Sequence, residues 1–284
     1  MKRLCVIAPL LVASAVLAGC GEQKAGEPVV SVSLKGEDGE ERVPVAADSA
    51  APASDLSGLP SACSPASFEG VALTHCVADP DAHTISAAYG SGDGSVPYGD
   101  LKTLSRSVDA STIAFAMNGG TFSDDLTPRG YLVTDGNRLA ELDRGSGDGN
   151  FYLKPNGVFF GTGRAWRVLS TDRFFSTVRD RPQFGTQSGP MLLIDGELSD
   201  AISENGNSRA VRNGVGIDEG GKAHFVISNA PISYGQLARF LRDEAKATDA
   251  LFLDANSSSL WNPVSGRMDD GRTGPILVVS KKGE

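Results

Sequence analysis

Short apolar runs alternate with tight-turn residues through much of the chain, and this pattern limits the folds that it can adopt. Four pairs of apolar runs are each separated by a short turn. The turn residues are Asp135 and Gly136, Gly161 and Gly163, Asp195 and Gly196, and Gly220 and Gly221. Glycine readily adopts the positive φ that a tight hairpin turn requires, so an Asp-Gly pair between apolar runs is a strong hairpin signal. The sequence therefore predicts a sheet built largely from hairpins.

Helical patterns are few. Residues 233–245 begin with the pair Ser233 and Gln236 and carry apolar side chains on one face, which predicts a capped amphipathic helix. Residues 100–108 are a second helix candidate, and residues 170–178 are a weaker third. Hairpins combined with a few flanking helices predict an α+β fold around a largely antiparallel or mixed β-sheet core.

The first residues have the pattern of an export signal. Lys2 and Arg3 precede an apolar segment, residues 4–17, that is too short to span a bilayer. Residues 17–20 (Leu-Ala-Gly-Cys) resemble the lipobox of bacterial lipoproteins, in which the cysteine becomes the lipidated first residue. We therefore expect a signal peptide over residues 1–19 and a lipid on Cys20, which would anchor the protein to a membrane of the bacterial cell envelope. An ordinary cleaved signal with a chance cysteine is the alternative.

Residues 20–59 are rich in Gly, Glu, Ala, Ser and Pro and show no sustained apolar period, which is typical of a flexible tether. Residues 60–284 are long enough for one domain with a sizeable core, which we place in the periplasm or another extracytoplasmic space. Removal of Lys2 and Arg3 with the signal leaves 24 basic and 35 acidic side chains, a formal charge of −11. Such an acidic chain without a basic patch argues against a nucleic-acid partner.

Four cysteines are present, of which Cys5 leaves with the signal and Cys20 is expected to carry lipid. Cys63 and Cys76 remain as one pair in an oxidising compartment, which favours a disulfide between them. A metal site is the weaker alternative, because neither cysteine belongs to a C-x-x-C motif and only His75 is nearby.

The most informative local stretch is a buried strand, residues 113–117, that ends on Asn118, Gly119 and Gly120. Paired glycines after a strand allow backbone N–H groups to approach a ligand closely. Four other stretches also set polar residues beside Gly or Pro at the edge of an apolar run: residues 149–157, 186–190, 212–218 and 253–260. This pattern is typical of loops that meet at one face of a sheet.

Histidine is scarce, and His75, His83 and His224 all lie outside these loops. The candidate loops therefore lack the histidine that a Ser-His-Asp triad or a histidine-rich zinc site requires. We expect no cofactor and no metal. Carboxylates, amides, hydroxyls and Arg or Lys side chains remain, and these suit chemistry on glycosidic bonds.

Residues 117–122, Met-Asn-Gly-Gly-Thr-Phe, resemble a motif of the phosphodiester glycosidase family (the NAGPA domain, or DUF2233). The resemblance continues in the same order through residues 149–158, 186–191, 212–216, 225–228, 242–243 and 253–260, and Cys63 and Cys76 match a cysteine pair that opens many bacterial members. It implies hydrolysis of a sugar-1-phosphodiester similar to N-acetylglucosamine-1-phosphodiester. A glycan phosphodiester is then the expected partner.

The resemblance assigns roles to individual residues. Asp254 is expected to activate water or to form a covalent intermediate, and Arg212 to hold the phosphate. Ala255 and Asn256 follow Asp254 where the family often has Gly-Gly or Gly-Ser. Alanine does not easily adopt positive φ, so we expect a different loop shape after Asp254, and this slightly favours the alternative function, a non-catalytic glycan-binding envelope lipoprotein. The expected substrate contacts are Asn118, Gly119, Gly120, Arg129, Lys154, Asn156, Gln187, Ser188, Gly189, Asn213, Ser257 and Ser258.

Overall fold

Short antiparallel ladders build three larger sheets in the computed structural model, which describes residues 56, 58–91, 96–253 and 257–283. Every strand pair in these ranges is antiparallel, so the predicted hairpin-based sheet is confirmed, whereas the expected option of a mixed sheet finds no parallel pair there. The predicted signal peptide, residues 1–19, and nearly all of the predicted tether, residues 20–59, lie outside the described residues.

Neighbouring strands within each sheet are often far apart in the sequence. In spatial order, the seven-stranded sheet consists of β1 (Cys63–Phe68), β2 (Val71–Ala78), β15 (Ala223–Ser228), β14 (Asn213–Asp218), β16 (Ala247–Phe252), β12 (Met191–Ile194) and β13 (Glu197–Leu198). The second sheet consists of β10 (Ala165–Ser170), β9 (Gly157–Thr162), β11 (Phe184–Ser188), β7 (Leu132–Thr134) and β8 (Asn137–Ala140). The third consists of β18 (Arg267–Met268), β17 (Leu260–Asn262), β6 (Ile113–Asn118), β19 (Ile276–Lys281) and β3 (His83–Ala88). A separate ladder pairs β4 (Gly90–Ser91) with β5 (Val96–Pro97).

All four predicted hairpins are present, as β7–β8, β9–β10, β12–β13 and β14–β15. Asp135 and Asp195 have φ of 48° and 49°, and the glycines that follow them have φ of 75° and 85°. Two successive residues with positive φ match the right-handed twist of the flanking strands, which explains the Asp-Gly pairs. These turns were therefore predictable from the sequence.

The three predicted helices are also present, each shorter than its sequence pattern. They are α1 (Leu101–Ser105), α2 (Thr171–Thr177) and α3 (Tyr234–Arg239), and the side chains of Asp100, Ser170 and Ser233 cap their N-termini. After α3 the predicted helix continues as one π-helical turn, η3 (Phe240–Glu244), in which Ala245 N donates to Phe240 O at 3.1 Å. Two short 3-10 turns, η1 (Ala110–Thr112) and η2 (Asn150–Tyr152), complete the helical elements of the described chain.

One apolar core connects the three sheets. Phe115 of β6 packs edge-on against Phe225 of β15 with ring centroids 5.2 Å apart. Phe159 of β9 packs edge-on against Phe184 of β11 at 5.2 Å and against Phe225 at 5.8 Å. Because these rings are almost fully buried, truncating one to alanine would cost about 3–5 kcal/mol.

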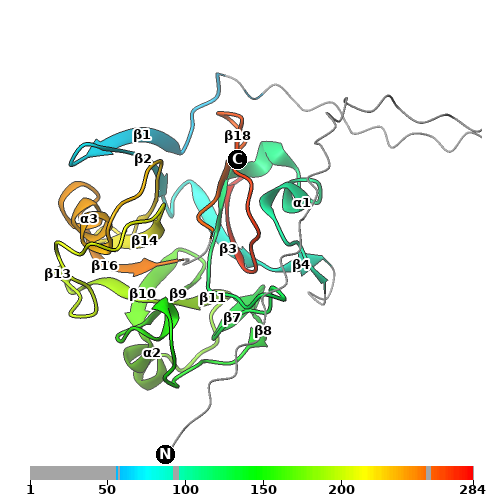
Figure 1. Cartoon of the computed structure of the whole chain (residues 1–284). Helices are drawn as coiled ribbons and strands as arrows, with labels where there is room; N and C mark the ends of the chain where they lie inside the picture. Colours follow the sequence, from blue (N-terminus) through cyan, green and yellow to red (C-terminus); the bar gives the residue numbers. More distant parts are fainter. Residues whose placement is uncertain (1–55, 57, 92–95, 254–256, 284) are drawn as a thin grey trace, which may run out of the picture. The chain divides into compact units, whose positions relative to one another are not determined.

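Each sheet carries a helix on the face opposite this core (Figure 1). The helical side chains that pack there are Leu101 and Leu104 of α1 on the third sheet, Phe174 of α2 on the second, and Leu237 of α3 with Leu241 of η3 on the seven-stranded sheet. At Gly216 of β14, an added Cβ would lie 2.6 Å from the Cβ of Ala247, so this close packing requires glycine. No helix in the described ranges is long and apolar enough to cross a membrane.

The predicted disulfide is present between Cys63 and Cys76, which face each other in the β1–β2 ladder. On β2 and β15, the side chains of His75 and His224 form a short polar chain, with His75 Nε2 3.0 Å from His224 Nδ1 and His224 Nε2 3.1 Å from Asp218 Oδ2. Burial, and to a smaller extent the nearby His224, lower the pKa of His75 to about 4.

The disulfide should contribute measurably to stability. The two cysteines are 13 residues apart, and closing a loop of about 15 residues is worth about 3 kcal/mol. We expect Cys63→Ser/Cys76→Ser to lower the free energy of unfolding in urea by about that amount, and reduction of the wild type to have the same effect. Alkylation of unreduced, denatured protein that finds both thiols free would contradict the disulfide.

Stability should fall as the pH decreases from about 6.5 to about 4. In this range His75 is protonated in the unfolded chain, whose histidine pKa is about 6.5, but not in the folded protein, so protons bind preferentially to the unfolded state. We expect the Tm of wild type to fall over this range by a few degrees more than that of His75→Phe, since about 1 kcal/mol corresponds to about 2–4 °C in a domain of this size. Parallel Tm profiles in thermal circular dichroism would exclude this role.

Candidate functional site

Strands from all three sheets begin or end at one place. β6 ends at Asn118, β11 ends at Ser188, β14 begins at Asn213, and Leu253 directly follows β16. The backbone joins two of these points, because Leu253 N donates to Asn213 O at 3.2 Å. We call the side chains of Asn118, Thr121, Ser188, Asn213, Ser258 and Ser259 the strand-end cluster.

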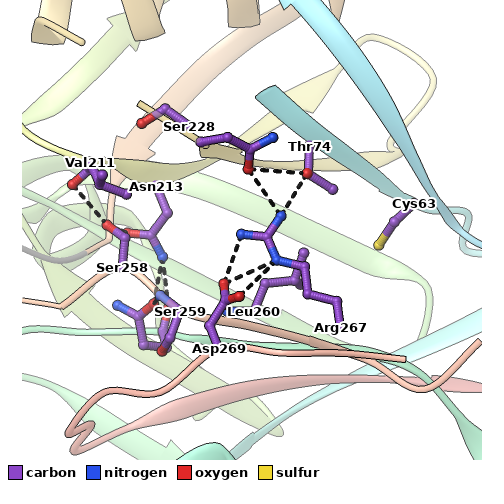
Figure 2. Close-up of polar contacts among 12 residues, drawn as sticks. Cys63, Thr74, Val211, Asn213, Ser228, Ser258, Ser259, Leu260, Arg267 and Asp269 are labelled. Carbon is purple, nitrogen blue, oxygen red and sulfur yellow. Dashed lines mark hydrogen bonds and ion pairs between the residues drawn. The ribbon is translucent and has the colours of Figure 1, made fainter. Parts of the chain in front are cut away.

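Two buried carboxamides form the centre of the strand-end cluster (Figure 2). Asn213 Nδ2 donates to Asn118 Oδ1 at 2.9 Å and to Asn118 O at 3.2 Å. Asn118 Oδ1 also accepts from the backbone N–H of Ser259 at 2.7 Å. A fully buried carboxamide would be costly without such partners, so these bonds fix the ends of β6 and β14 and the residues that lead into β17.

Hydroxyl groups extend the cluster on both sides. Ser188 Oγ donates to Leu253 O at 3.0 Å and lies 3.2 Å from Thr121 Oγ1. Ser258 Oγ lies 3.2 Å from Val211 O and 3.3 Å from Asn213 Oδ1. The Ser259 hydroxyl is buried and forms no hydrogen bond with the described part of the chain. The structure thus brings together Asn118, Ser188, Asn213 and Ser258, which are four of the expected substrate contacts, and it shows mutual contacts that the sequence did not reveal.

Arg212 precedes Asn213 and belongs to the opposite face of the sheet, as successive residues of a strand do. Only 4% of Arg212 is exposed, and its guanidinium carbon lies 3.6 Å from the ring centroid of Tyr234 at the start of α3. Arg212 Nε donates to Ile232 O at 2.9 Å, and Nη2 donates to Ser208 O and Oγ at 3.2 and 3.0 Å. All of these partners are neutral.

No carboxylate of the described residues pairs with Arg212, and its Nη1 donates to none of their acceptors. A buried guanidinium without a counter-charge is costly, and neutral oxygens compensate for only part of that cost. The geometry is therefore suited to an anion that approaches the guanidinium. None of the hydrogen bonds of Arg212 reaches the strand-end cluster, so the expected site residues lie on two faces at this end of the sheet.

The side-chain amide of Gln187 is fully hydrogen-bonded within the protein. Its Oε1 accepts from Tyr131 N at 2.9 Å and from Asp143 N at 3.0 Å. Its Nε2 donates to Asp143 O at 2.7 Å and to Thr171 Oγ1 at 3.1 Å. A carboxamide has two donor hydrogens and two acceptor lone pairs, and all four are used here. This arrangement corrects the expected contact of Gln187 with sugar hydroxyls, because no bonding capacity remains.

Close packing explains the glycines of the candidate loops. Gly119 N already donates to Pro275 O at 2.9 Å, so the expected substrate contact of Gly119 through this N–H does not fit. A Cβ at Gly119 would collide with the Leu277 side chain, and one at Gly120 would collide with Thr186. At Gly189 an added Cβ would lie 2.7 Å from the Cβ of Asn156.

The remaining expected contacts form separate groups. Lys154 Nζ donates to Asn156 Oδ1 at 3.1 Å, and Asn156 Nδ2 donates to Phe151 O at 2.9 Å, beside Gly189. Arg129 is exposed, and its Nε lies 3.3 Å from Ser123 Oγ. Ser257 Oγ donates to the backbone of Arg272 at 2.6 Å. Asp254 follows Leu253 in the chain but lies outside the described residues.

A clamp of charged and polar side chains lies next to the cluster (Figure 2). Arg267 donates from Nη2 to Asp269 Oδ2 at 2.7 Å and from Nη1 to Thr74 Oγ1 at 2.7 Å and to Asn229 Oδ1 at 3.1 Å. Asp269 Oδ2 in turn accepts from Leu260 N at 3.0 Å. The clamp thus ties the β17–β18 hairpin to β2 of the seven-stranded sheet.

Sequence reasoning missed several residues that shape the site. Thr121 and Ser259 lay inside the motif stretches, so their position was a usable signal. Ser208 and Tyr234 carried no local signal, because their contact with Arg212 exists only in three dimensions. Within the described residues, no group of three His, Cys, Asp or Glu side chains is arranged to hold a metal ion.

Comparisons with known proteins agree with this architecture. The model of the family described as NAGPA, phosphodiester glycosidase, matches residues 111–275. The uncharacterized protein YigE of Escherichia coli (strain K12) is 31% identical over 165 residues, which cover 58% of this chain and 64% of YigE. The match therefore spans less than two thirds of that relative.

Two solved structures have a similar fold. The catalytic domain of zebrafish N-acetylglucosamine-1-phosphodiester alpha-N-acetylglucosaminidase, auto-inhibited by its pro-peptide, has a TM-score of 0.53 and 16% identity over 78% of this chain and 82% of that chain. A hypothetical protein from Synechocystis has a TM-score of 0.50 and 15% identity over 78% of this chain and 61% of that chain. At these identities the likeness concerns the fold alone. Because the family model matches more than half of its length, this chain belongs to the phosphodiester glycosidase family.

Proposed function

We propose that this protein hydrolyses a sugar-1-phosphodiester and that Arg212 binds the phosphate. The observation that carries the proposal is the burial of Arg212 without a carboxylate partner among the described residues. Family membership supports it, as does the name of the zebrafish relative, which describes cleavage at an N-acetylglucosamine-1-phosphodiester. The sugar that this chain accepts is left open by the proposal.

Phosphate is a chemically suitable partner for the Arg212 guanidinium. A planar guanidinium presents parallel N–H donors that match two oxygens of a phosphate, and such charge-assisted bonds are stronger than neutral ones. The bonds from Nε and Nη2 to Ile232 and Ser208 already orient the group, and Tyr234 supports its flat face. An anion would therefore meet a preorganised donor and would balance its buried charge.

The reaction breaks the anomeric C–O bond through a transition state in which positive charge develops on the sugar ring and negative charge on the leaving phosphate. Arg212 would stabilise the departing phosphate, so that a strong general acid is not required. Asp254 is proposed to supply the carboxylate that activates water or attacks the anomeric carbon. Asp254 directly follows Leu253 in the chain, and the carbonyl of Leu253 accepts a hydrogen bond from Ser188 Oγ.

The strand-end cluster would contribute rigidity. Its carboxamides and hydroxyls are bonded mainly to one another, so they fix the loops that carry substrate contacts. The buried hydroxyl of Ser259, which has no partner among the described residues, is the group in the cluster best able to take a new hydrogen bond. Preorganised dipoles of this kind avoid a reorganisation cost during the reaction.

A non-catalytic glycan-binding protein is the second candidate. It is favoured by Ala255 and Asn256, which stand where the family often has Gly-Gly or Gly-Ser after the corresponding aspartate. Both candidates place an anionic glycan at Arg212, and only turnover separates them.

The proposed enzyme should depend on Arg212. We expect Arg212→Met, which keeps the length and apolar contact of the side chain, to lower kcat/KM about 10²–10³-fold, because one preorganised charge-stabilising donor is lost. The assay is hydrolysis of a chromogenic N-acetylglucosamine-1-phosphodiester and of a panel of related sugar phosphodiesters. Arg209→Ala is the matched control, since Arg209 is exposed, lies nearby in sequence and contacts the neutral Gln236.

The same assay tests Asp254. Asp254→Asn keeps the shape of the side chain and should reduce turnover more than Arg212→Met does, while circular dichroism remains that of the wild type. Equal rates for wild type and Asp254→Asn would refute the mechanism. Absence of turnover with every phosphodiester, together with measurable glycan binding, would support the second candidate.

We also propose that the mature protein is a lipoprotein of the bacterial cell envelope, anchored through Cys20. The motivation is the lipobox-like sequence and the Gly- and Glu-rich segment that follows it. Cys20→Ala should move the protein from the membrane fraction to the soluble fraction after cell lysis. A variant that stays with the membrane at low and high salt would show that the anchor lies elsewhere.

A further inference from the structure

A pocket of about 420 Å³ lies on the helix-bearing face of the second sheet. It is lined by Tyr131, which directly precedes β7, by Arg138 of β8, by the segment after β8, and by α2 with the residues that follow it. Tyr131 forms part of its wall and packs against Phe174 of α2 with ring centroids 5.1 Å apart. Arg212 and the strand-end cluster do not line it, so this pocket is separate from the candidate site.

The lining is cationic although the chain as a whole is acidic. Four arginines, Arg138, Arg144, Arg179 and Arg181, face two carboxylates, Glu141 and Asp180, which leaves a formal surplus of two positive charges. The whole chain carries a formal charge of −9. A local surplus of guanidinium groups in an acidic chain attracts anions by Coulomb forces, and at this exposed position the attraction is screened by salt.

The four arginines differ in how many of their N–H donors are used. Arg138 pairs with Glu141 at 2.9 Å, and Arg144 approaches Asp172 at 3.5 Å. Arg179 forms no ion pair or hydrogen bond with the described residues, and Arg181 makes one long bond, 3.4 Å, to Gly136 O. Arg179 and Arg181 are thus able to bind a phosphate or a carboxylate without first breaking an internal pair.

An aromatic surface adjoins these donors. Phe175 of α2 is 55% exposed, which is unusual for so large an apolar side chain, and the Arg144 guanidinium lies 4.0 Å from its ring centroid. The positive charges of Arg138 and Arg181 also act on the pKa of Tyr131, which burial raises, so both guanidiniums lie near its phenol. An exposed aromatic side chain that lines the same pocket as Arg179 and Arg181 matches a ring that carries an anionic substituent.

We propose that this pocket is a second, non-catalytic binding site for an anionic saccharide, with Arg179 and Arg181 contacting its phosphate or carboxylate and Phe175 contacting its ring. The choice of a saccharide rests on the proposed function, whereas the choice of an anion rests on the pocket alone. A glycan with several charged units would occupy both sites, and the pocket would then raise the affinity for long substrates.

The test is calorimetric titration at low salt with N-acetylglucosamine 1-phosphate, N-acetylglucosamine and inorganic phosphate. It is run on the wild type and on Arg212→Met, in which the candidate site no longer contributes. We expect the sugar phosphate to bind both proteins and the neutral sugar to bind neither detectably. Added to Arg212→Met, Arg179→Ala/Arg181→Ala should weaken binding of the sugar phosphate about tenfold, since two charge-assisted contacts at an exposed position are lost.

Arg164→Ala/Arg167→Ala is the matched control, because it removes two positive charges from exposed positions outside the pocket. It should leave the affinity unchanged. Phe175→Ala should weaken binding of the sugar phosphate but not of inorganic phosphate. In the Arg212→Met background, unchanged affinity after Arg179→Ala/Arg181→Ala, or equal affinity for the sugar phosphate and inorganic phosphate, would overturn the proposal.

The outcomes also separate this site from the proposed function. Loss of turnover in Arg212→Met with retained binding of the sugar phosphate would support both proposals. Binding that disappears in Arg212→Met and persists in Arg179→Ala/Arg181→Ala would locate the anion at the candidate site alone, and the second site would be refuted.

Discussion

The shared apolar core is the constraint on which the rest of this structure depends. Phe115, Phe159, Phe184 and Phe225 come from three different sheets and contact one another edge-on, so no sheet can bury its inner face without the others. The opposite face of each sheet is then covered by a single short helix. With both faces buried, the strand ends are the places where polar groups can gather.

Burial at the strand ends determines what those polar groups do. Asn118 and Asn213 are fully buried and bond to each other, and Ser188 bonds to the carbonyl of Leu253. Each bond joins segments far apart in the sequence, which gives the loops fixed positions. Arg212 differs because the described residues that its guanidinium contacts are neutral and include no carboxylate.

Much of the fold was predictable from the sequence, and less of the site was. The hairpins at Asp135 and Asp195 follow from residues that tolerate positive φ, and the caps Asp100, Ser170 and Ser233 mark the true helix starts. Gln187 shows the limit of such reasoning. Its motif position suggested a substrate contact, whereas its four hydrogen bonds hold Tyr131, Asp143 and Thr171.

The sequence by itself determined turns, caps, strand periodicity and family membership, because these depend on residues close together in the chain or on their order. Only the tertiary structure decided that Arg212 and Asn213, adjacent in the chain, face opposite sides of the sheet. Arg212 packs against Tyr234, whereas Asn213 bonds to Asn118. The tertiary structure also decided that Arg138 of β8 and Phe175 of α2, far apart in the chain, line one pocket. The physical reason is that contacts between distant segments depend on how the sheets pack, and local propensity does not encode that packing.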